Sequence, residues 1–394
     1  MTRPIRVLHL LVTTSPGGGP KHVYDLVRHL PVNEFEVVVA APRDGTFFDR
    51  FRDLGVIIVE LPLSRLGARH LPLAMRIVKK YGVDIVHTHG KGPGLYGRLA
   101  ARRLGVPAVH TFHGIHYGSY SRAGQWLYLT LERGLSRLSH AIINVSESQQ
   151  AEGLALGLFE PGQSVVVVNG VDLDEVDRTI RESTVRRDML GLSADDFVIG
   201  CVSRWDPVKR LEILLQAVRR LASRLPRLTL LLVGGGGEEA RIRRLVADTG
   251  LQDRVIFTGF LGDPTRIYGT LDLYVATSLK EGLPLAPLEA MGASLAIVAT
   301  DVPGHRDVVV NGETGILVPP EDSAALAEAI ASLGADPARR RKLGEAGRQR
   351  VLDHFAINTM VDKTADVYRR AVGVPGRTSS GGSPAGGKVR PGGW

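Results

Sequence analysis

The sequence of 394 residues contains a single cysteine, Cys201, so an internal disulfide is excluded. No cysteine cluster is present that could hold zinc or an iron–sulfur centre, which favours a reducing, cytoplasmic compartment. The chain also lacks a run of about 18 uninterrupted apolar residues, because its longest candidate, residues 283–299, contains two prolines and Glu289. Residues 5–12 form a strand-like run where a secretory signal would stand. We therefore expect no structural disulfide, no membrane-spanning helix and no secretion by that route.

Acidic residues are scarce in one segment of the first half. Residues 65–140 carry 12 basic and two acidic side chains, a local charge of +10, whereas the whole chain is +8. A basic block of this kind is compatible with nucleic acid, anionic lipid or a phosphorylated substrate. Aromatic residues make up only 6% of the chain and no known reader motif accompanies the block, so we expect no nucleic-acid partner.

Short, continuously apolar segments alternate with amphipathic helical patterns along the chain. Such segments are typical of strands buried in a parallel sheet whose two faces are covered by helices. The pattern runs through the first half and then restarts, which predicts an α/β fold of two Rossmann-like, doubly wound parallel-sheet domains. The predicted strands are residues 5–12, 35–41, 56–61, 85–88, 108–112 and 141–145, then 197–203, 229–233, 255–258, 273–276, 296–299 and 315–318.

An Asn-Gly pair at residues 169–170 favours a tight turn and marks the domain junction. We expect residues 1–170 to form the N-terminal domain and residues 171–354 the C-terminal domain. A last helix, residues 355–374, is expected to pack back on the N-terminal domain. Residues 375–394 contain 7 Gly, 3 Pro and 3 Ser, a composition that predicts a disordered tail.

Glycine-rich loops follow predicted strands in both halves. Residues 13–20, which include Gly17 and Gly18, precede a helix predicted over residues 21–30. Their spacing is not that of a nicotinamide-binding loop, and no acidic residue follows at the ribose-binding distance. In the second half, residues 233–237 form another glycine run. Glycine allows a ligand to approach the backbone closely, and a helix N-terminus favours negative charge, so these loops point to a nucleotide.

Arg204 and Lys209 lie in residues 201–210, between a predicted strand and a helix. In an open α/β sheet this is the edge where ligands bind, and two cations there can clamp a diphosphate. Basic residues beside a helix start are, taken alone, more often simply solvated. The glycine run at 233–237 belongs to the same edge of the same sheet, which favours the nucleotide interpretation.

Glu281 and Glu289 are separated by seven residues in a segment framed by Gly282, Pro284 and Pro287. Proline is tolerated in the first turn of a helix but breaks its interior, so we expect Glu281 in a loop and Glu289 in the first helical turn. Both carboxylates then face the crevice. Carboxylates accept paired hydrogen bonds from vicinal hydroxyls, which makes a sugar and a ribose plausible partners.

In combination these motifs resemble the family-4 retaining glycosyltransferases of the two-domain GT-B fold. The resemblance rests on Gly17-Gly18, residues 169–172, Arg204 with Lys209, the glycine run, and Glu281 with Glu289, and it covers residues 5–373. It implies an acceptor-side N-terminal domain and a C-terminal domain that binds a nucleotide sugar.

The resemblance also implies a role for each site residue. Arg204 and Lys209 would neutralise the donor diphosphate, Glu289 would hold the ribose and Glu281 would contact the transferred sugar. His113, at the end of a predicted strand, matches the active-site histidine of the family. The implied catalytic residues are His113, Arg204, Lys209 and Glu281, and the implied donor-binding residues are Gly18, Arg204, Lys209, Glu281, Gly282, Leu283, Leu285 and Glu289.

The expected reaction is sugar transfer with retention from a nucleotide-diphosphate sugar, with a UDP-sugar favoured over a GDP-sugar, to a hydroxyl of a glycan, glycolipid or lipid-linked acceptor. We expect no metal and no cofactor, and a place in cell-surface or exopolysaccharide biosynthesis. A nucleotide-sugar epimerase or a phosphorylase on the same fold is the nearest alternative. A more distant one is a metal hydrolase built on His87, His89, His110, His113 and His116.

Residues 120–140 combine Trp126, Leu127 and Tyr128 with Arg122 and Arg133 in one helical pattern. An ordinary surface helix has this composition, but so does a helix that lies on anionic lipid. The sequence leaves two locations open, the cytoplasm and a peripheral position on the inner face of the cell membrane.

Overall fold

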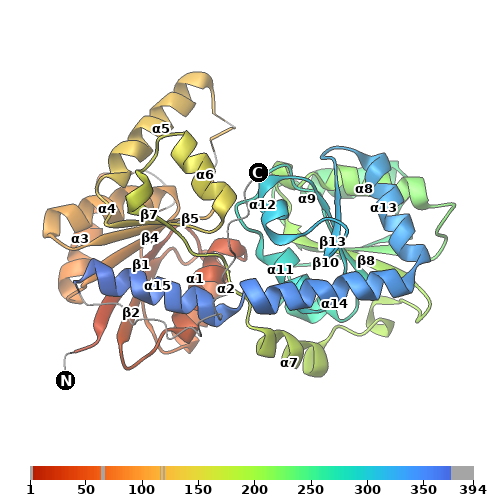
Figure 1. The fold of residues 1–394 in the computed structure, drawn as a ribbon, viewed down its shortest axis with the longest axis horizontal. Helices are drawn as coiled ribbons and strands as arrows, with labels where there is room; N and C mark the ends of the chain where they lie inside the picture. The colour runs from red at the N-terminus through yellow and green to blue at the C-terminus, as the bar shows by residue number, and fades with distance from the viewer. Residues whose placement is uncertain (1–2, 64–66, 116, 119, 374–394) are drawn as a thin grey trace, which may run out of the picture.

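The computed structural model describes residues 3–63, 67–115, 117–118 and 120–373. The tail predicted to be disordered, residues 375–394, lies outside these residues, as do Arg65 of the basic block and His116. The described chain forms two α/β units, each with its own parallel sheet (Figure 1). The predicted fold class is confirmed.

The first sheet has seven parallel strands in the order β3-β2-β1-β4-β5-β6-β7. This order reverses direction beside β1, as in doubly wound folds. Val7 of β1 packs into one apolar cluster and Leu8 into another, so successive residues serve opposite faces of the sheet. The strands are β1 Ile5–Leu11, β2 Phe35–Ala41, β3 Ile57–Glu60, β4 Ile85–His89, β5 Ala108–Phe112, β6 Ala141–Asn144 and β7 Ser164–Val166.

The second sheet repeats the same topology with six parallel strands in the order β10-β9-β8-β11-β12-β13. Its strands are β8 Phe197–Arg204, β9 Leu228–Gly235, β10 Val255–Gly259, β11 Leu273–Ala276, β12 Ile297–Thr300 and β13 Gly315–Val318. Each predicted strand coincides with an observed one to within two residues at either end. The exception is β7, which the sequence does not predict; it is a three-residue edge strand whose side chains are only half-buried.

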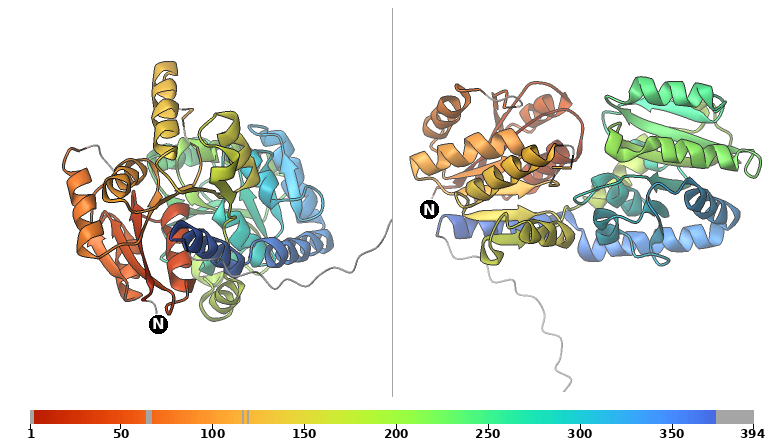
Figure 2. Two further views of the ribbon diagram at one scale, coloured as in Figure 1. Left: turned by 60° about the vertical axis from the view of Figure 1, so that its left-hand side comes forward. Right: turned by 90° about the horizontal axis from the view of Figure 1, so that it is seen from above.

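Helices connect the strands and cover the sheets (Figure 2). The helices of the first unit are α1 Gly18–His29, α2 Thr46–Asp53, α3 His70–Lys80, α4 Lys91–Leu104, α5 Arg122–Ser136, α6 Glu147–Ala155 and the 3₁₀ helix η1 Pro161–Gln163. Those that follow are α7 Leu173–Ser183, η2 Asp188–Leu190, η3 Pro207–Lys209, α8 Leu211–Leu221, α9 Glu239–Asp248, α10 Thr265–Tyr268, α11 Leu285–Gly292, α12 Pro303–Val308, α13 Ser323–Ala335, α14 Pro337–His354 and α15 Ile357–Ala371.

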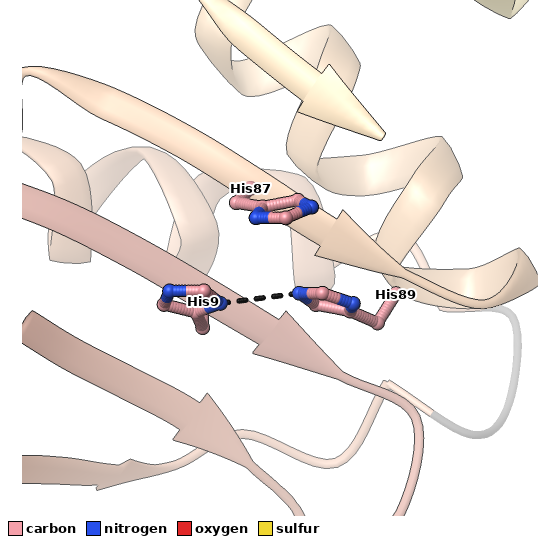
Figure 3. Close-up of side chains that lie close together, drawn as sticks. All are labelled: His9, His87 and His89. Carbon is pink, nitrogen blue, oxygen red and sulfur yellow. Dashed lines mark hydrogen bonds between the residues drawn. The ribbon is translucent and has the colours of Figure 1, made fainter. Parts of the chain in front are cut away.

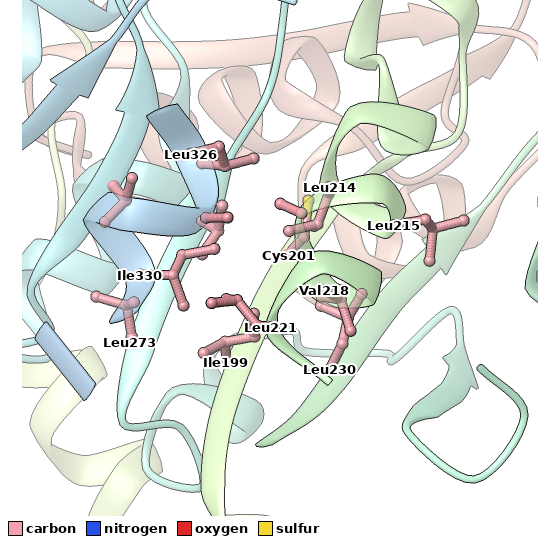
Figure 4. Packing of buried hydrophobic residues seen from close by; sticks show 14 of the residues in the cluster. Ile199, Cys201, Leu214, Leu215, Val218, Leu221, Leu230, Leu273, Leu326 and Ile330 are labelled. Atoms are coloured by element: carbon pink, nitrogen blue, oxygen red, sulfur yellow. The ribbon is translucent and has the colours of Figure 1, made fainter. Parts of the chain in front are cut away.

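Amphipathic periodicity explains how these helices attach. In α8, Leu214, Val218 and Leu221 recur at helical spacing and are buried against strand residues such as Ile199 and Leu230 (Figure 4). The helix predicted over residues 21–30 begins earlier, at Gly18. Its first turn is built from glycine and proline, and proline is tolerated there because the first amide groups of a helix have no partner inside it.

The chain passes between the two units twice, and the two crossings touch. Val171 pairs with Ala356 in an isolated parallel bridge. After the second crossing, α15 packs on the first unit (Figure 1). Its residues Met360 and Tyr368 join the core of that unit. Arg369 on α15 forms an ion pair with Glu34 at 2.6 Å. The C-terminal helix is thus part of the first unit's core.

Among the residues that the structure describes, no helix has both the length and the apolar character required to cross a bilayer.

Gly170 is required at the crossing because the backbone of α15 lies against it. A Cβ on Gly170 would stand 2.6 Å from the Cα of Ile357. We expect Gly170→Ala to destabilise the protein by about 1–3 kcal/mol, because backbone must move to accommodate the methyl group. Thermal and urea unfolding would measure the loss. Gly162→Ala is the matched control, because its Cβ meets nothing within 4 Å; equal stability of the two variants would contradict the prediction.

Candidate active site in the cleft between the two units

A cleft of about 670 Å³ is lined by loops from both units. The structure brings every predicted site residue to this cleft, and the role of each one remains a prediction. The lining includes Gly18 and His113 from the first unit and Arg204, Lys209, Glu281, Gly282, Leu283, Leu285 and Glu289 from the second.

Strand direction explains this convergence. In a parallel sheet all carboxyl ends lie on one edge, and the loops that leave them meet there. In the first unit, β1 leads into the glycine loop and β5 ends directly before His113. In the second unit, β8 ends at Arg204 and β11 leads into the loop that carries Glu281. The carboxyl edges of both sheets therefore supply the cleft.

Glu281 is an ionised carboxylate held by a cation. The Lys209 ammonium and the Ser278 hydroxyl each donate to Glu281 Oε1 at 2.6 Å. Burial alone would raise the pKa of Glu281, but Lys209 and His305 outweigh burial and hold that pKa below its ordinary value. Lys209 and Glu281 therefore form an ion pair at the cleft, in which the two charges compensate each other.

Arg204 supplies a second, more exposed cation. Its side chain is 55% exposed and pairs with Asp206 at 2.6 Å. Its Cδ lies 3.8 Å from the place where a Cβ on Gly17 would stand, so the guanidinium side chain borders the glycine loop of the first unit. Two cations within one cleft, one of them a planar guanidinium, suit the oxygens of a diphosphate.

Glu289 is buried in the second turn of α11, not in the first turn as predicted. The helix begins at Leu285, so Pro287 takes its third position and Glu289 its fifth. Tyr268 donates its hydroxyl hydrogen to Glu289 Oε2 at 2.9 Å. Burial raises the pKa of Glu289 to about 7, although the Lys21 ammonium opposes this shift. The carboxyl group still lines the cleft, where its ionised form can accept two hydroxyls.

The loop before α11 is fixed by the first unit. Ser146 donates to the carbonyl of Gly282 at 3.0 Å, and Asn169 Nδ2 donates to the carbonyl of Leu283 at 2.7 Å. Among the residues that the structure describes, no side chain caps the N-terminus of α11, which begins at Leu285. Free amide groups at a helix N-terminus attract anions, so this end of α11 complements the two cations.

His113 sits where the two units touch. A Cβ on Gly282 would stand 3.3 Å from the His113 carbonyl, so backbone approaches backbone and only glycine fits without a shift. The Nε2 atom of His113 lies 3.0 Å from Nδ1 of His89. His113 thus lies beside the loop that carries Gly282, and its ring is anchored towards the interior of the first unit.

Three further described residues, Lys21, Asn169 and Tyr268, contribute to the site and were not predicted from the sequence. Lys21 on α1 lines the cleft and lies near Glu289. Its position two residues after Gly17-Gly18-Gly19 is the signal in the sequence that favours a ligand contact. Asn169 was interpreted only as a turn residue, whereas its side chain joins the two units. Tyr268 had no signal in the sequence, because its contact depends on how α10 packs on α11.

The histidines group differently from the predicted metal site. The rings of His87 and His89 lie 4.1 Å apart on one side of β4, as their spacing predicts. His110 bonds instead to Thr88 at 2.7 Å. Within the described residues, the three-donor groups with ligand atoms within 4.8 Å are His9–His87–His89 (Figure 3) and His22–His89–His113. Neither includes His110, and neither contains a carboxylate or thiolate that would offset a cation's charge in a buried site.

Two family models match the chain, one on each unit. Residues 16–175 match the model described as Glycosyltransferase Family 4, and residues 183–350 match the model described as Glycosyl transferases group 1. Among solved structures, that of Anabaena Alr3699/HepE in complex with UDP and glucose has a TM-score of 0.81 at 23% identity, covering 92% of this chain and 98% of that one. Sucrose-phosphate synthase from Thermosynechococcus elongatus has a TM-score of 0.78 at 26% identity, with coverages of 93% and 98%.

Proteins related in sequence are also named as glycosyltransferases. The putative glycosyltransferase EpsD of Bacillus subtilis is 33% identical over 300 residues, 74% of this chain and 78% of the relative. An Escherichia coli enzyme named UDP-Gal:alpha-D-GlcNAc-diphosphoundecaprenol alpha-1,3-galactosyltransferase is 28% identical over 374 residues, 92% of this chain and 96% of the relative. The two parallel-sheet units, the cleft between them and these matches together show that the chain belongs to glycosyltransferase family 4 and is a glycosyltransferase of the GT-B fold.

Proposed function

We propose that this glycosyltransferase moves a sugar from a UDP-sugar to a hydroxyl of a glycan or lipid-linked acceptor, with retention of the anomeric configuration. The observation that carries the proposal is the convergence of Arg204, the Lys209–Glu281 pair and buried Glu289 in one cleft. The name of the Escherichia coli relative specifies a UDP-sugar and an acceptor on a lipid diphosphate, and structures with the same fold hold UDP. These names support the choice of donor and acceptor class.

The donor diphosphate lies, in this proposal, between the two cations and the N-terminus of α11. Arg204 and Lys209 neutralise the negative charge that develops on the leaving nucleotide. The free amide groups at the N-terminus of α11 add to the positive potential at the same place. Glu289 accepts the ribose hydroxyls. This chain thereby supplies its own positive charge for the leaving group, so transfer needs no metal ion.

Glu281 contacts the transferred sugar in this proposal and does not form a bond to it. Its Oε1 atom already accepts hydrogen bonds from Lys209 and Ser278, and both reduce its nucleophilic character. The acceptor hydroxyl then attacks the anomeric carbon on the face that the nucleotide leaves, through an oxocarbenium-like state. His113 lies beside this place, at the contact between the two units.

Helix α5 suits an acceptor held at a membrane. It stands out from the first unit (Figure 2). Its residues Tyr128 and Glu132 line the cleft. Its opposite face exposes 69% of Trp126 and 62% of Leu127 to solvent. Exposed Arg122 lies on the same helix and favours anionic lipid. We therefore propose that α5 rests on an anionic membrane and places the cleft beside lipid-linked acceptors.

Arg204→Ala tests the leaving-group assignment. Loss of one preorganised charge that acts in the transition state is expected to lower kcat about 10²- to 10³-fold. Release of nucleoside diphosphate would be measured with UDP-, GDP- and ADP-sugars, with and without acceptor. Arg224→Ala is the matched control, because Arg224 forms a surface pair with Glu328. A normal rate for Arg204→Ala would refute the assignment, and conversion of the donor into an isomeric nucleotide sugar without acceptor would favour an epimerase.

The raised pKa of Glu289 predicts a pH-dependent affinity for UDP. Ribose hydroxyls need the ionised carboxylate, and the pKa near 7 means that this form is lost as the pH falls through neutrality. We expect the affinity of the wild-type protein for UDP to fall about tenfold between pH 8 and pH 6 relative to Glu289→Gln. The affinity is measured by calorimetric titration of the wild type and of Glu289→Gln. Protonation of UDP affects both proteins equally, so the difference between their pH profiles reports on Glu289 alone. Parallel pH profiles would show that Glu289 does not bind the ribose.

Membrane docking predicts that Trp126→Ser/Leu127→Ser binds anionic vesicles at least about tenfold more weakly than the wild type, because two exposed apolar side chains lose their lipid contacts. Co-sedimentation with phosphatidylglycerol vesicles at low salt measures this. Leu352→Ser is the control, because Leu352 is 48% exposed but lies on α14 of the second unit. If the wild-type protein stays in the supernatant, the docking proposal fails.

A further inference from the structure

Most of the basic side chains that line the cleft are paired within the chain. Lys91 donates to the Tyr120 hydroxyl at 2.6 Å. Arg50 on α2 also lines the cleft, but within the described part of the chain it has neither an ion pair nor a side-chain hydrogen bond. The four ion pairs of the lining are Lys21 with Asp25, Arg204 with Asp206, Lys209 with Glu281 and Lys280 with Glu152.

Two aromatic rings hold the guanidinium of Arg50 in place. Its Cζ atom lies 4.5 Å from the centre of the Tyr24 ring on α1 and 4.8 Å from the centre of the Phe47 ring on its own helix. Long side chains of a helix lean towards its N-terminus, which explains why Arg50 reaches the ring one turn earlier. A ring face attracts a cation but carries no net negative charge. The half-buried Arg50 side chain is therefore ordered without being neutralised.

The helix that carries Arg50 is fastened to the glycine loop of the first unit. The backbone N–H of Phe47 donates to the Thr14 carbonyl at 3.1 Å. A Cβ on Gly45, directly before α2, would stand 2.3 Å from the Cα of Ser15, so backbone lies against backbone there. Arg50 is thus held on a fixed element at the carboxyl edge of the first sheet, beside the loop that Arg204 borders from the second unit.

The proposed sugar transfer gives the two sides of the cleft different ligands. The nucleotide sugar lies against Arg204, Lys209 and Glu289 of the second unit, which leaves the first unit to face the acceptor. A guanidinium that no carboxylate neutralises favours an anionic ligand. Its planar set of N–H groups matches two oxygens of one phosphate group. An acceptor on a lipid diphosphate carries such a group, and so does a soluble sugar phosphate.

We propose that Arg50 binds a phosphate group of the acceptor, so that the enzyme selects phosphorylated acceptors over neutral sugars. This proposal rests on the proposed sugar transfer, because it assigns the first unit to the acceptor. The donor diphosphate is the competing occupant of this position. It already has two cations and the N-terminus of α11, whereas the acceptor has no other unpaired arginine in the described lining of the cleft.

Calorimetric titration of the protein saturated with UDP measures the acceptor side alone, because UDP fills the diphosphate site of the donor. Glucose 1-phosphate is the probe for a soluble phosphorylated acceptor, and geranyl diphosphate is the probe for a diphosphate on a lipid. We expect the wild type to bind at least one of them. Arg50→Gln should bind the same probe about ten- to a hundredfold more weakly, the value of one charge-assisted hydrogen bond. The probe that binds identifies the source of the phosphate.

Two further variants control for packing and for charge. Arg52→Gln alters the same helix at a side chain that is 56% exposed and pairs with Asp49 at 2.9 Å, so it should bind the probes as the wild type does. Arg50→Lys retains the positive charge and should recover most of the affinity that Arg50→Gln loses. The affinity for UDP, measured without a probe, should be the same in all four proteins.

Four results would overturn the proposal. The first is a wild-type protein that binds neither phosphate probe with UDP present, a result that needs no variant to fold. The second is stronger binding of glucuronate than of either probe, which would make the ligand a carboxylate. The third is a weaker affinity of Arg50→Gln for UDP itself, which would place Arg50 on the donor side. The fourth is an equal loss of probe binding in Arg50→Gln and Arg50→Lys, which would reduce Arg50 to a packing role.

Failure of this proposal is distinguishable from failure of the proposed sugar transfer. The titrations require no turnover, whereas the proposed transfer is tested by the release of nucleoside diphosphate in the presence of an acceptor. A protein that transfers sugar to a neutral acceptor, at the same rate in the wild type and in Arg50→Gln, would retain the proposed function and lose the phosphate site.

Discussion

The side-chain amide of Asn169 fixes how the two halves of the cleft meet. Its Nδ2 donates to the Leu283 carbonyl at 2.7 Å, and its Oδ1 accepts from Nδ1 of His22 at 2.9 Å. The side chain is almost fully buried, and a buried polar group without its partner costs about 1–3 kcal/mol, so the two bonds are retained together. Leu283 lies between Glu281 and the start of α11 at Leu285. Together with Ser146, this amide therefore holds the loop before α11 against the first unit.

Glu281 and Glu289 belong to one sequence motif, but their different surroundings give their carboxyl groups different pKa values. Glu281 and Glu289 are both buried, yet the pKa of Glu281 lies below its ordinary value and that of Glu289 rises to about 7. The difference is the nearest partner: Glu281 has the Lys209 ammonium at 2.6 Å, whereas Glu289 has the neutral Tyr268 hydroxyl. The carboxylate of Glu281 therefore stays ionised at neutral pH, whereas the ionisation of Glu289 changes as the pH passes through 7.

The sequence was sufficient for the sheets because strands buried on both faces are continuously apolar, as in β8, and that pattern depends on no distant residue. It failed at β7, which pairs on one side only and whose residues are only half-buried. The cleft residues could be predicted because carboxyl strand ends share one edge. The partners of these residues could not be predicted. The contact of Tyr268 with Glu289, for example, exists only once α10 and α11 have packed together.

The fold separates the basic residues of segment 65–140 into buried and exposed ones, and this separation explains how α5 is oriented. Arg98 is fully buried, and it donates to the Gly94 carbonyl at 2.7 Å and to Glu132 at 2.6 Å. A buried ion pair is costly to break because one charge would remain without a partner in the interior, so this pair fixes α5 to α4. With Glu132 directed inwards, Trp126 must lie on the outer part of the helix. One of the charges that suggested a ligand surface is thus an internal anchor, and the apolar outer face of α5 is a consequence of it.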